Sequence, residues 1–232
     1  MARGTESAQT TSVRVPIGDR SLNGDLGIPP RAHGIVLFAH GSGSSRHSSR
    51  NQHVARALER RDLATLLIDL LTPQEESIDD RTAQYRFDIP MLAQRLVTIV
   101  DWLGSLKETA TLPIGLFGAS TGGGAALMAA AERPGEIAAV VSRGGRPDLA
   151  GPSLARVMAP TLLIVGGLDA TVIEMNRDAM QQMRGEVTLE IVPGATHLFE
   201  EPGTLEQVAE LAGDWFTRHL RPPLSTPWMS WR

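Results

Sequence analysis

The sequence predicts an α/β fold, in which helices cover both faces of a mostly parallel sheet. Short continuous apolar runs, such as G-I-V-L-F-A-H at 34–40, are typical of strands that are buried on both sides. Runs with helical spacing, such as I-P-M-L-A-Q-R-L-V-T-I-V-D-W-L at 89–103, follow them. The two patterns alternate along most of the 232 residues, as expected where helices connect parallel strands.

The individual elements follow from these patterns in chain order. The segments 12–17 and 21–28 alternate apolar and polar residues, which predicts a hairpin of half-exposed strands. Strands are predicted at 34–40, 64–71, 113–118, 137–142, 161–166 and 187–192, and the first three of these are expected to be buried. Helices are predicted at 51–61, 89–103, 125–133, 172–183 and 205–220, and Pro90 is acceptable in the first turn of its helix. The stretch 72–86 is polar and irregular, so no element is predicted there.

The length and composition predict one globular domain. A chain of 232 residues can bury a substantial core, and its 42% hydrophobic and 21% charged residues are ordinary for a globular protein. No low-complexity linker divides the sequence. We expect a flexible N-terminus at 1–11, a single domain at 12–221 and a proline-broken tail at 222–232.

Charge and residue usage exclude several classes of function. A formal net charge of −4 gives no electrostatic reason to expect a nucleic-acid partner. Because cysteine is absent, disulfides, thiolate nucleophiles and thiolate metal sites are excluded. Neither a metal nor a cofactor is expected, the latter in line with the family resemblance described below. No apolar run reaches the length of a membrane span, and the polar N-terminus lacks the apolar core of a signal peptide. These features predict a soluble cytoplasmic protein with no membrane partner. Trp228 and Trp231 in the tail leave a homo-oligomer contact open.

The stretch G-A-S-T-G at 118–122 places Ser120 between a predicted strand and a predicted helix. This is the G-x-S-x-G pattern of a nucleophile elbow, a tight strand-to-helix turn that needs small residues where the chain packs against itself. The N–H groups that begin the helix would point at the negative charge that develops during acyl transfer. The alternative is a tight turn whose serine only caps the helix.

A serine nucleophile needs a base, and the base needs an orienting group. His197 follows the last predicted strand, and Asp169 follows the strand before it. Both residues therefore lie at the carboxyl edge of the sheet, as Ser120 does, and the order Ser, Asp, His is that of α/β-hydrolases. Alternatively, His197 is an ordinary surface residue and Asp169 caps the helix at 172, while Asp148 is the second choice for the acid.

The glycine-rich loop A-H-G-S-G-S-S-R at 39–46 follows another buried strand. We expect the N–H groups of Ser42 and Thr121 to form an oxyanion hole, with Gly43 as the alternative to Ser42. His40 is expected to pack beneath the loop. Phosphate binding is the other interpretation of such a loop, but the sequence lacks the Walker lysine and contains no G-x-G-x-x-G.

Four motifs together resemble those of the α/β-hydrolase superfamily over about residues 12–220: H-G-S-G (40–43), G-A-S-T-G (118–122), G-G-L-D (166–169) and A-T-H (195–197). In detail the chain is most similar to the dienelactone-hydrolase-like branch, small hydrolases without a large cap. This resemblance implies an eight-stranded, mostly parallel sheet and cofactor-free hydrolysis of an ester or related acyl bond. Dienelactone hydrolases proper use cysteine at the elbow, whereas this chain has Ser120, which favours a general serine carboxylesterase.

The residues around the expected pocket suggest what it accepts. The connection 142–158 is too short for a cap domain, so an open site and small or short-chain esters are expected. Arg81 and Tyr85 resemble in placement the pair that holds the substrate carboxylate in dienelactone hydrolases, and a solvated loop is the alternative. Arg143 and Arg146 are further candidates for an anion contact.

The sequence thus predicts a serine hydrolase that cleaves small ester substrates through Ser120, His197 and Asp169. A thioesterase, lactonase or peptidase with the same three residues is a second hypothesis. A non-catalytic binding module on the same fold is a third.

Overall fold

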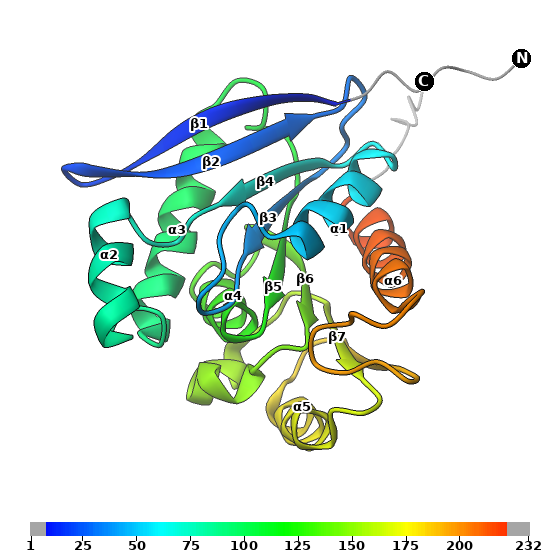
Figure 1. Cartoon of the computed structure of the whole chain (residues 1–232). Helices are drawn as coiled ribbons and strands as arrows, with labels where there is room; N and C mark the ends of the chain where they lie inside the picture. The colour runs from blue at the N-terminus through cyan, green and yellow to red at the C-terminus, as the bar shows by residue number, and fades with distance from the viewer. Residues whose placement is uncertain (1–7, 222–232) are drawn as a thin grey trace, which may run out of the picture.

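The computed structural model describes residues 8–221, which form one sheet with helices on both faces (Figure 1). The strands are β1 (Gln9–Ile17), β2 (Arg20–Ile28), β3 (Ile35–Ala39), β4 (Ala64–Ile68), β5 (Ile114–Ala119), β6 (Ile137–Arg143), β7 (Thr161–Gly166) and β8 (Val187–Val192). The helices are α1 (Ser49–Glu59), α2 (Pro73–Thr82), α3 (Ile89–Ser105), α4 (Thr121–Glu132), the 3₁₀ segment η1 (Pro147–Arg156), α5 (Ala170–Gln182) and α6 (Thr204–His219).

The sheet has eight strands in the order β1-β2-β4-β3-β5-β6-β7-β8. β1 pairs with β2, and β2 with β4, in antiparallel register, while all later pairs are parallel. The predicted fold class is therefore confirmed. The parallel strands β3, β5, β6, β7 and β8 all end at one edge, and the loops that follow them meet there.

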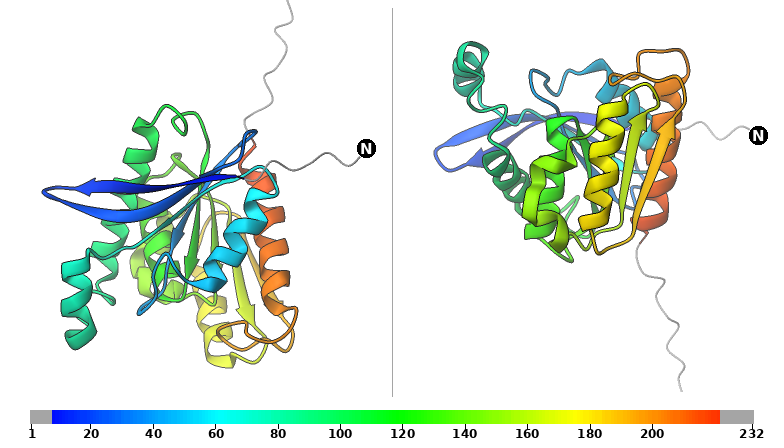
Figure 2. Two further views of the ribbon diagram at one scale, coloured as in Figure 1. Left: turned by 45° about the horizontal axis from the view of Figure 1, so that its top comes forward. Right: turned by 90° about the horizontal axis from the view of Figure 1, so that it is seen from below.

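The two larger apolar cores lie on opposite faces of the sheet, as the pleat requires. Val36 and Phe38 of β3 pack with α1 and α6, whereas Ile35 and Leu37 belong to the core formed with α3 and α4. Figure 2 shows this layering, with α1 and α6 on one side of the sheet and α4 and α5 on the other. The predicted continuous apolar strands match this burial, because β3, β4 and β5 are buried throughout.

The segment without a predicted element contains a helix. Residues 73–82 form α2, which begins with a capping box: the Thr72 hydroxyl accepts from the N–H of Glu75, and the Glu75 carboxylate accepts from the N–H of Thr72. Pro73 occupies the first turn, where its missing N–H costs nothing. The prediction failed because α2 carries almost no apolar stripe, so its periodicity is weak.

Other boundaries moved less. β1 begins at Gln9, three residues before the predicted strand, because its pairing with β2 extends to Ile28. The connection between β6 and β7 contains only η1, so no inserted cap lies over this edge of the described chain. Among residues 8–221, no helix combines the length and apolar character required to cross a membrane. Trp228 and Trp231 lie outside the described residues.

Candidate active site

Ser120 lies at the sharp turn between β5 and α4, with φ 50° and ψ −123°. Such a conformation is strained for a residue other than glycine and costs about 1–3 kcal/mol. A Cβ at Gly118 would lie 2.5 Å from the Cα of Gly123, and one at Gly122 would lie 2.6 Å from the carbonyl oxygen of His40. Both flanking glycines are therefore required by close packing of backbone against backbone, as the elbow motif predicts.

The Ser120 side chain does not cap the helix. Ser120 occupies the N-cap position of α4, but its hydroxyl makes no capping hydrogen bond. The backbone is held instead: the Ser120 N–H donates to the carbonyl of Arg143 at 3.2 Å, and the Ser120 carbonyl accepts from the N–H of Arg146 at 3.1 Å. The capping interpretation of this serine therefore has no support in the structure.

Asp169 and His197 meet at the same edge of the sheet. His197 Nδ1 and Asp169 Oδ2 are 2.7 Å apart, although all of α5 and all of β8 lie between the two residues in the chain. Asp169 occupies the N-cap position of α5 without making a side-chain capping bond. Its carboxylate is thus directed to the imidazole and not to its own helix. Because Nδ1 is taken, Nε2 is the ring nitrogen left for another partner.

Gly144 connects the histidine to the elbow. This glycine has φ +50°, and a Cβ there would lie 3.1 Å from the carbonyl oxygen and 3.5 Å from the Cε1 atom of His197. The carbonyl oxygen of the preceding residue, Arg143, accepts a hydrogen bond from the N–H of Ser120. His197 and Ser120 therefore flank the same short backbone segment. Ser120, Asp169 and His197 therefore lie at the same edge of the sheet. Within the described residues, however, no hydrogen bond joins the Ser120 hydroxyl to the imidazole of His197.

The loop that carries His197 is anchored on both sides of the histidine. Thr196 donates through its N–H and its hydroxyl to the carboxylate of Glu201, at 3.1 and 2.6 Å. These two bonds hold the pKa of Glu201 below its ordinary value. Phe199 is buried and adopts a positive φ of 56°, which is unusual for a bulky residue. These contacts hold the loop in place on either side of His197.

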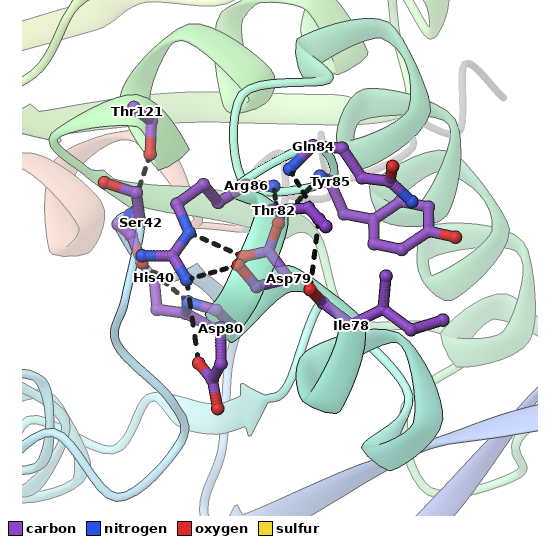
Figure 3. Close-up of polar contacts among 11 residues, drawn as sticks. His40, Ser42, Ile78, Asp79, Asp80, Thr82, Gln84, Tyr85, Arg86 and Thr121 are labelled. Carbon is purple, nitrogen blue, oxygen red and sulfur yellow. Dashed lines mark hydrogen bonds and ion pairs between the residues drawn. The ribbon is translucent and has the colours of Figure 1, made fainter.

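The predicted oxyanion donors lie side by side, but one of them is already bonded. The Ser42 N–H donates to the Thr121 hydroxyl at 2.9 Å (Figure 3). Thr121 is the first residue of α4, so its own N–H has no partner within the helix. Gly43, the alternative donor, has φ +67°. The structure therefore brings Ser42, Gly43 and Thr121 together beside the elbow.

His40 supports the loop from beneath, as expected. Its Nε2 accepts from the N–H of Leu70, and its Nδ1 donates to the carbonyl of Gly41, both at 2.9 Å. These two bonds require the neutral ring. Burial lowers the pKa of His40, although the Gly41 carbonyl and Asp69 oppose this shift. His40 is therefore a structural residue that ties the glycine loop to the end of β4.

A cleft opens beside this loop. It is lined by residues of the loop, of the end of β4, of α2 and of α3, together with Thr121 and Arg86. Arg86, which the sequence analysis missed, points toward Ser42 and His40 in Figure 3. Its Nε donates to Asp79 Oδ2 at 2.6 Å. Burial opposes ionisation of Asp79, but the N–H and guanidinium of Arg86 and the N–H of Tyr85 hold the pKa of this carboxyl below its ordinary value.

Arg81 and Tyr85 are not part of this cleft lining. Arg81 is exposed in the last turn of α2. Tyr85 contributes its N–H to Asp79, while its ring lies on the side away from Ser42 (Figure 3). The chain turns at Ala83, which has φ 53°, and this turn delivers Arg86 instead. The expected contact of Arg81 and Tyr85 with a substrate carboxylate therefore gains no support from the geometry.

Arg143 and Arg146 have different surroundings. Arg146 makes two bonds to Asp148, at 2.8 and 2.7 Å, which raise the pKa of the guanidinium. Asp148, the second choice for the acid, is thereby engaged away from His197. Arg143 is only 7% exposed, and its Nε and Nη1 have no hydrogen-bond partner. Burial, together with the charge of Arg50, lowers the pKa of Arg143 to about 10.

The side chains of residues 8–221 also bear on whether a metal ion could bind. In this part of the chain, no group of three or more His, Asp or Glu side chains is arranged to hold a metal ion.

Comparison with known proteins defines the family. A family model described as an alpha/beta hydrolase domain matches residues 32–212. The chain therefore belongs to the α/β-hydrolase family. The dienelactone hydrolase of Anabaena variabilis is 59% identical and superimposes with a TM-score of 0.92 over 93% of this chain and 100% of that one. Est1E from Butyrivibrio proteoclasticus shares the fold, with a TM-score of 0.75 over 90% and 98% of the two chains at 17% identity.

Two curated relatives carry a different name. Proteins from two strains of Mycobacterium tuberculosis, provisionally named phosphoribosyl transferases, are 58% identical over 211 residues. The match covers 91% of this chain but 47% of each relative. The chain thus spans about half the length of these curated relatives.

Proposed function

We propose that this chain is a serine hydrolase that cleaves small or short-chain carboxylic esters. The observation that carries the proposal is the 2.7 Å contact between Asp169 and His197, at the sheet edge that also holds the strained Ser120 turn. Serine, histidine and aspartate are the residue types of a catalytic triad, and their position at one edge of a hydrolase fold supports the proposal. The hydrolase family and the similar dienelactone hydrolase support the general class of reaction.

The proposed mechanism assigns one role to each residue. Ser120 Oγ attacks the carbonyl carbon, and His197 Nε2 accepts the hydroxyl proton. Asp169 orients the ring and stabilises the imidazolium through Nδ1. The N–H of Thr121 donates to the oxyanion from the start of α4. His197 then protonates the leaving alkoxide, and a water molecule, deprotonated by the same imidazole, hydrolyses the acyl-enzyme and restores Ser120.

Within residues 8–221 the site has no cap over it, and its surroundings favour small substrates. The connection after β6 is short, so the cleft beside the glycine loop opens to solvent. The cleft lining includes Glu76, Asp79 and Asp80 but only one arginine, Arg86, which is already paired with Asp79. This balance of charge argues against a carboxylate-bearing lactone as the preferred substrate and supports neutral esters.

Two alternatives use the same fold. A thioesterase, lactonase or peptidase would keep the same residues and differ only in the bond cleaved. The transferase name of the mycobacterial relatives belongs to proteins about twice as long as this chain, and no residue described here gives phosphoribosyl transfer a mechanism. A non-catalytic module would retain the fold without turnover.

The test is hydrolysis of p-nitrophenyl esters of increasing acyl length by the wild type and by Ser120→Ala. We expect turnover that declines with chain length in the wild type and its loss in Ser120→Ala, while Ser77→Ala, a change at an exposed serine in α2, retains full activity. A panel of matched ester, thioester, lactone and amide substrates then identifies the bond. Unchanged turnover by Ser120→Ala would refute the proposal.

A further inference from the structure

The glycine loop and the elbow are joined by one polar contact between residues 79 positions apart. The backbone N–H of Ser42 donates to Thr121 Oγ1 at 2.9 Å (Figure 3). In the expected oxyanion hole, this N–H would donate directly to the substrate oxygen. In the structure the Thr121 hydroxyl occupies that donor, so Ser42 cannot serve an oxyanion unless Thr121 moves or takes part.

The Thr121 hydroxyl still has its own proton to donate. A hydroxyl has one donor and two acceptor positions, and here an acceptor position is used by Ser42. Threonine in a helix commonly donates to a carbonyl one turn earlier, but Thr121 stands at the first position of α4 and lacks such a partner. Within residues 8–221, the Thr121 hydroxyl donates to no protein acceptor. Thr121 directly follows Ser120 in the chain and also lines the cleft, so its hydroxyl lies between the proposed nucleophile and the cleft.

We propose that the Thr121 hydroxyl is itself an oxyanion donor, with the Ser42 N–H behind it. This inference rests on the proposed function. The chain of donors runs from Ser42 N–H to Thr121 Oγ1, and from the Thr121 O–H to the oxygen of the tetrahedral intermediate. No proton is transferred along it. A hydroxyl that accepts one hydrogen bond donates another more strongly, so the N–H of Ser42 polarises the donor that touches the substrate.

Two other roles of the same contact make opposite predictions. If the Thr121 hydroxyl only blocks the Ser42 N–H until substrate binds, removing the hydroxyl frees that N–H for the oxyanion. In that case kcat rises or stays constant. If the contact only ties the loop to α4, its removal lowers stability and leaves the rate of the folded enzyme almost unchanged. A true donor is lost from the transition state, so kcat falls while KM changes little.

The experiment compares Thr121→Val, Thr121→Ala and Thr121→Ser with the wild type. We measure kcat and KM on a p-nitrophenyl ester, inhibition by phenylboronic acid, which forms a tetrahedral adduct with an active serine, and melting temperature. We expect kcat to fall about 100-fold or more in Thr121→Val and Thr121→Ala, as for other lost oxyanion donors. The affinity for the boronate should fall together with kcat, whereas KM should change less than about threefold. In Thr121→Ser, which keeps a hydroxyl, both kcat and boronate affinity should stay close to those of the wild type.

Thr121→Ala separates the loss of the hydroxyl from steric obstruction, because alanine ends at Cβ and, unlike valine, has no γ-methyl group that could fill the hole. Recovery of the wild-type rate in Thr121→Ala, or a rate at or above wild type in Thr121→Val, would overturn the inference. Stoichiometric labelling of Ser120 by a fluorophosphonate tests the proposed function separately. Labelled, active wild-type protein with unimpaired Thr121 variants overturns this inference alone, whereas wild-type protein that neither labels nor turns over overturns both.

Discussion

The elbow and the α2 side of the neighbouring cleft are held in place by different interactions. On the elbow side, backbone packs directly on backbone: Gly122 lies against the carbonyls of Ala39 and His40, and Gly118 against Gly123. On the α2 side, charged side chains do the positioning. Asp79 holds Arg86 at 2.6 Å, and Glu75 holds Arg95 at 2.6 Å. Close packing leaves no alternative conformation, whereas ion pairs respond to pH and to replacement of a side chain.

This structural difference matches the different roles that we propose for the two regions. Proposed bond making and breaking takes place on the packed side, where Ser120, Asp169 and His197 need fixed positions. The ionic side lines the cleft, and in our proposal it selects the substrate groups that the cleft accepts. We therefore expect substitutions on the packed side to abolish activity or folding, and those on the ionic side to have graded effects.

The largest expected effect is that of Asp169→Asn. An amide cannot stabilise the imidazolium, and it favours the wrong tautomer of His197, so kcat should fall by about 10³–10⁴-fold. The fold should be retained, because the Asp169 carboxylate caps no helix. Steady-state kinetics and circular dichroism together test this. A loss smaller than tenfold would show that the 2.7 Å contact with His197 is only structural.

Gly122→Ala tests whether backbone packing fixes the elbow. The added Cβ would lie 2.6 Å from the carbonyl oxygen of His40, and a backbone atom cannot rotate away. Overpacking of this kind should cost about 3 kcal/mol of unfolding free energy. The matched control is Gly104→Ala at an exposed position near the end of α3, where a Cβ meets nothing and stability should rise by about 0.5–1 kcal/mol. Urea unfolding measures both, and equal stabilities would contradict the packing argument.

Arg143→Met tests a charge that is buried without a partner. The folded-state pKa of Arg143, about 10, lies below its ordinary value, so at any pH under 10 the buried charge reduces stability. Removing it should raise the free energy of unfolding by about 1–3 kcal/mol, after the loss of a weak contact with the Phe199 ring. Arg177→Met, at an exposed arginine paired with Glu174, should change stability by less than about 0.5 kcal/mol. Destabilisation of Arg143→Met in urea would show that the guanidinium has acceptors.

The smallest expected effect is the pH response of the ionic side. The pKa of Asp79 is lowered in the folded state, so its contribution to stability is present above the unfolded pKa and is lost as pH falls through the folded value. Asp79→Asn should lower stability by about 1–2 kcal/mol at pH 7, because charge-assisted bonds to Arg86 are lost. Between pH 5 and pH 3 the variant should lose less stability than the wild type. Parallel curves would contradict this role of Asp79.

Local signals in the sequence were enough to predict most of the fold and part of the site. Continuous apolar runs mark strands such as β3 because both faces of the sheet are covered, and the glycines around Ser120 mark a turn with no room for side chains. α2 was missed because capping and ion pairs, and not an apolar stripe, stabilise it. Arg86 and the Ser42–Thr121 contact depend on how distant segments meet, which a single sequence does not reveal.

The central claim is that Ser120 is a nucleophile activated by His197 and Asp169. Reaction of the folded protein with a fluorophosphonate, followed by intact-mass and peptide-mapping mass spectrometry, tests it most directly. We expect one adduct per chain, located on Ser120, and labelling that is strongly slowed in His197→Ala and Asp169→Asn. An adduct on another residue, or no adduct on a folded chain, would contradict the claim.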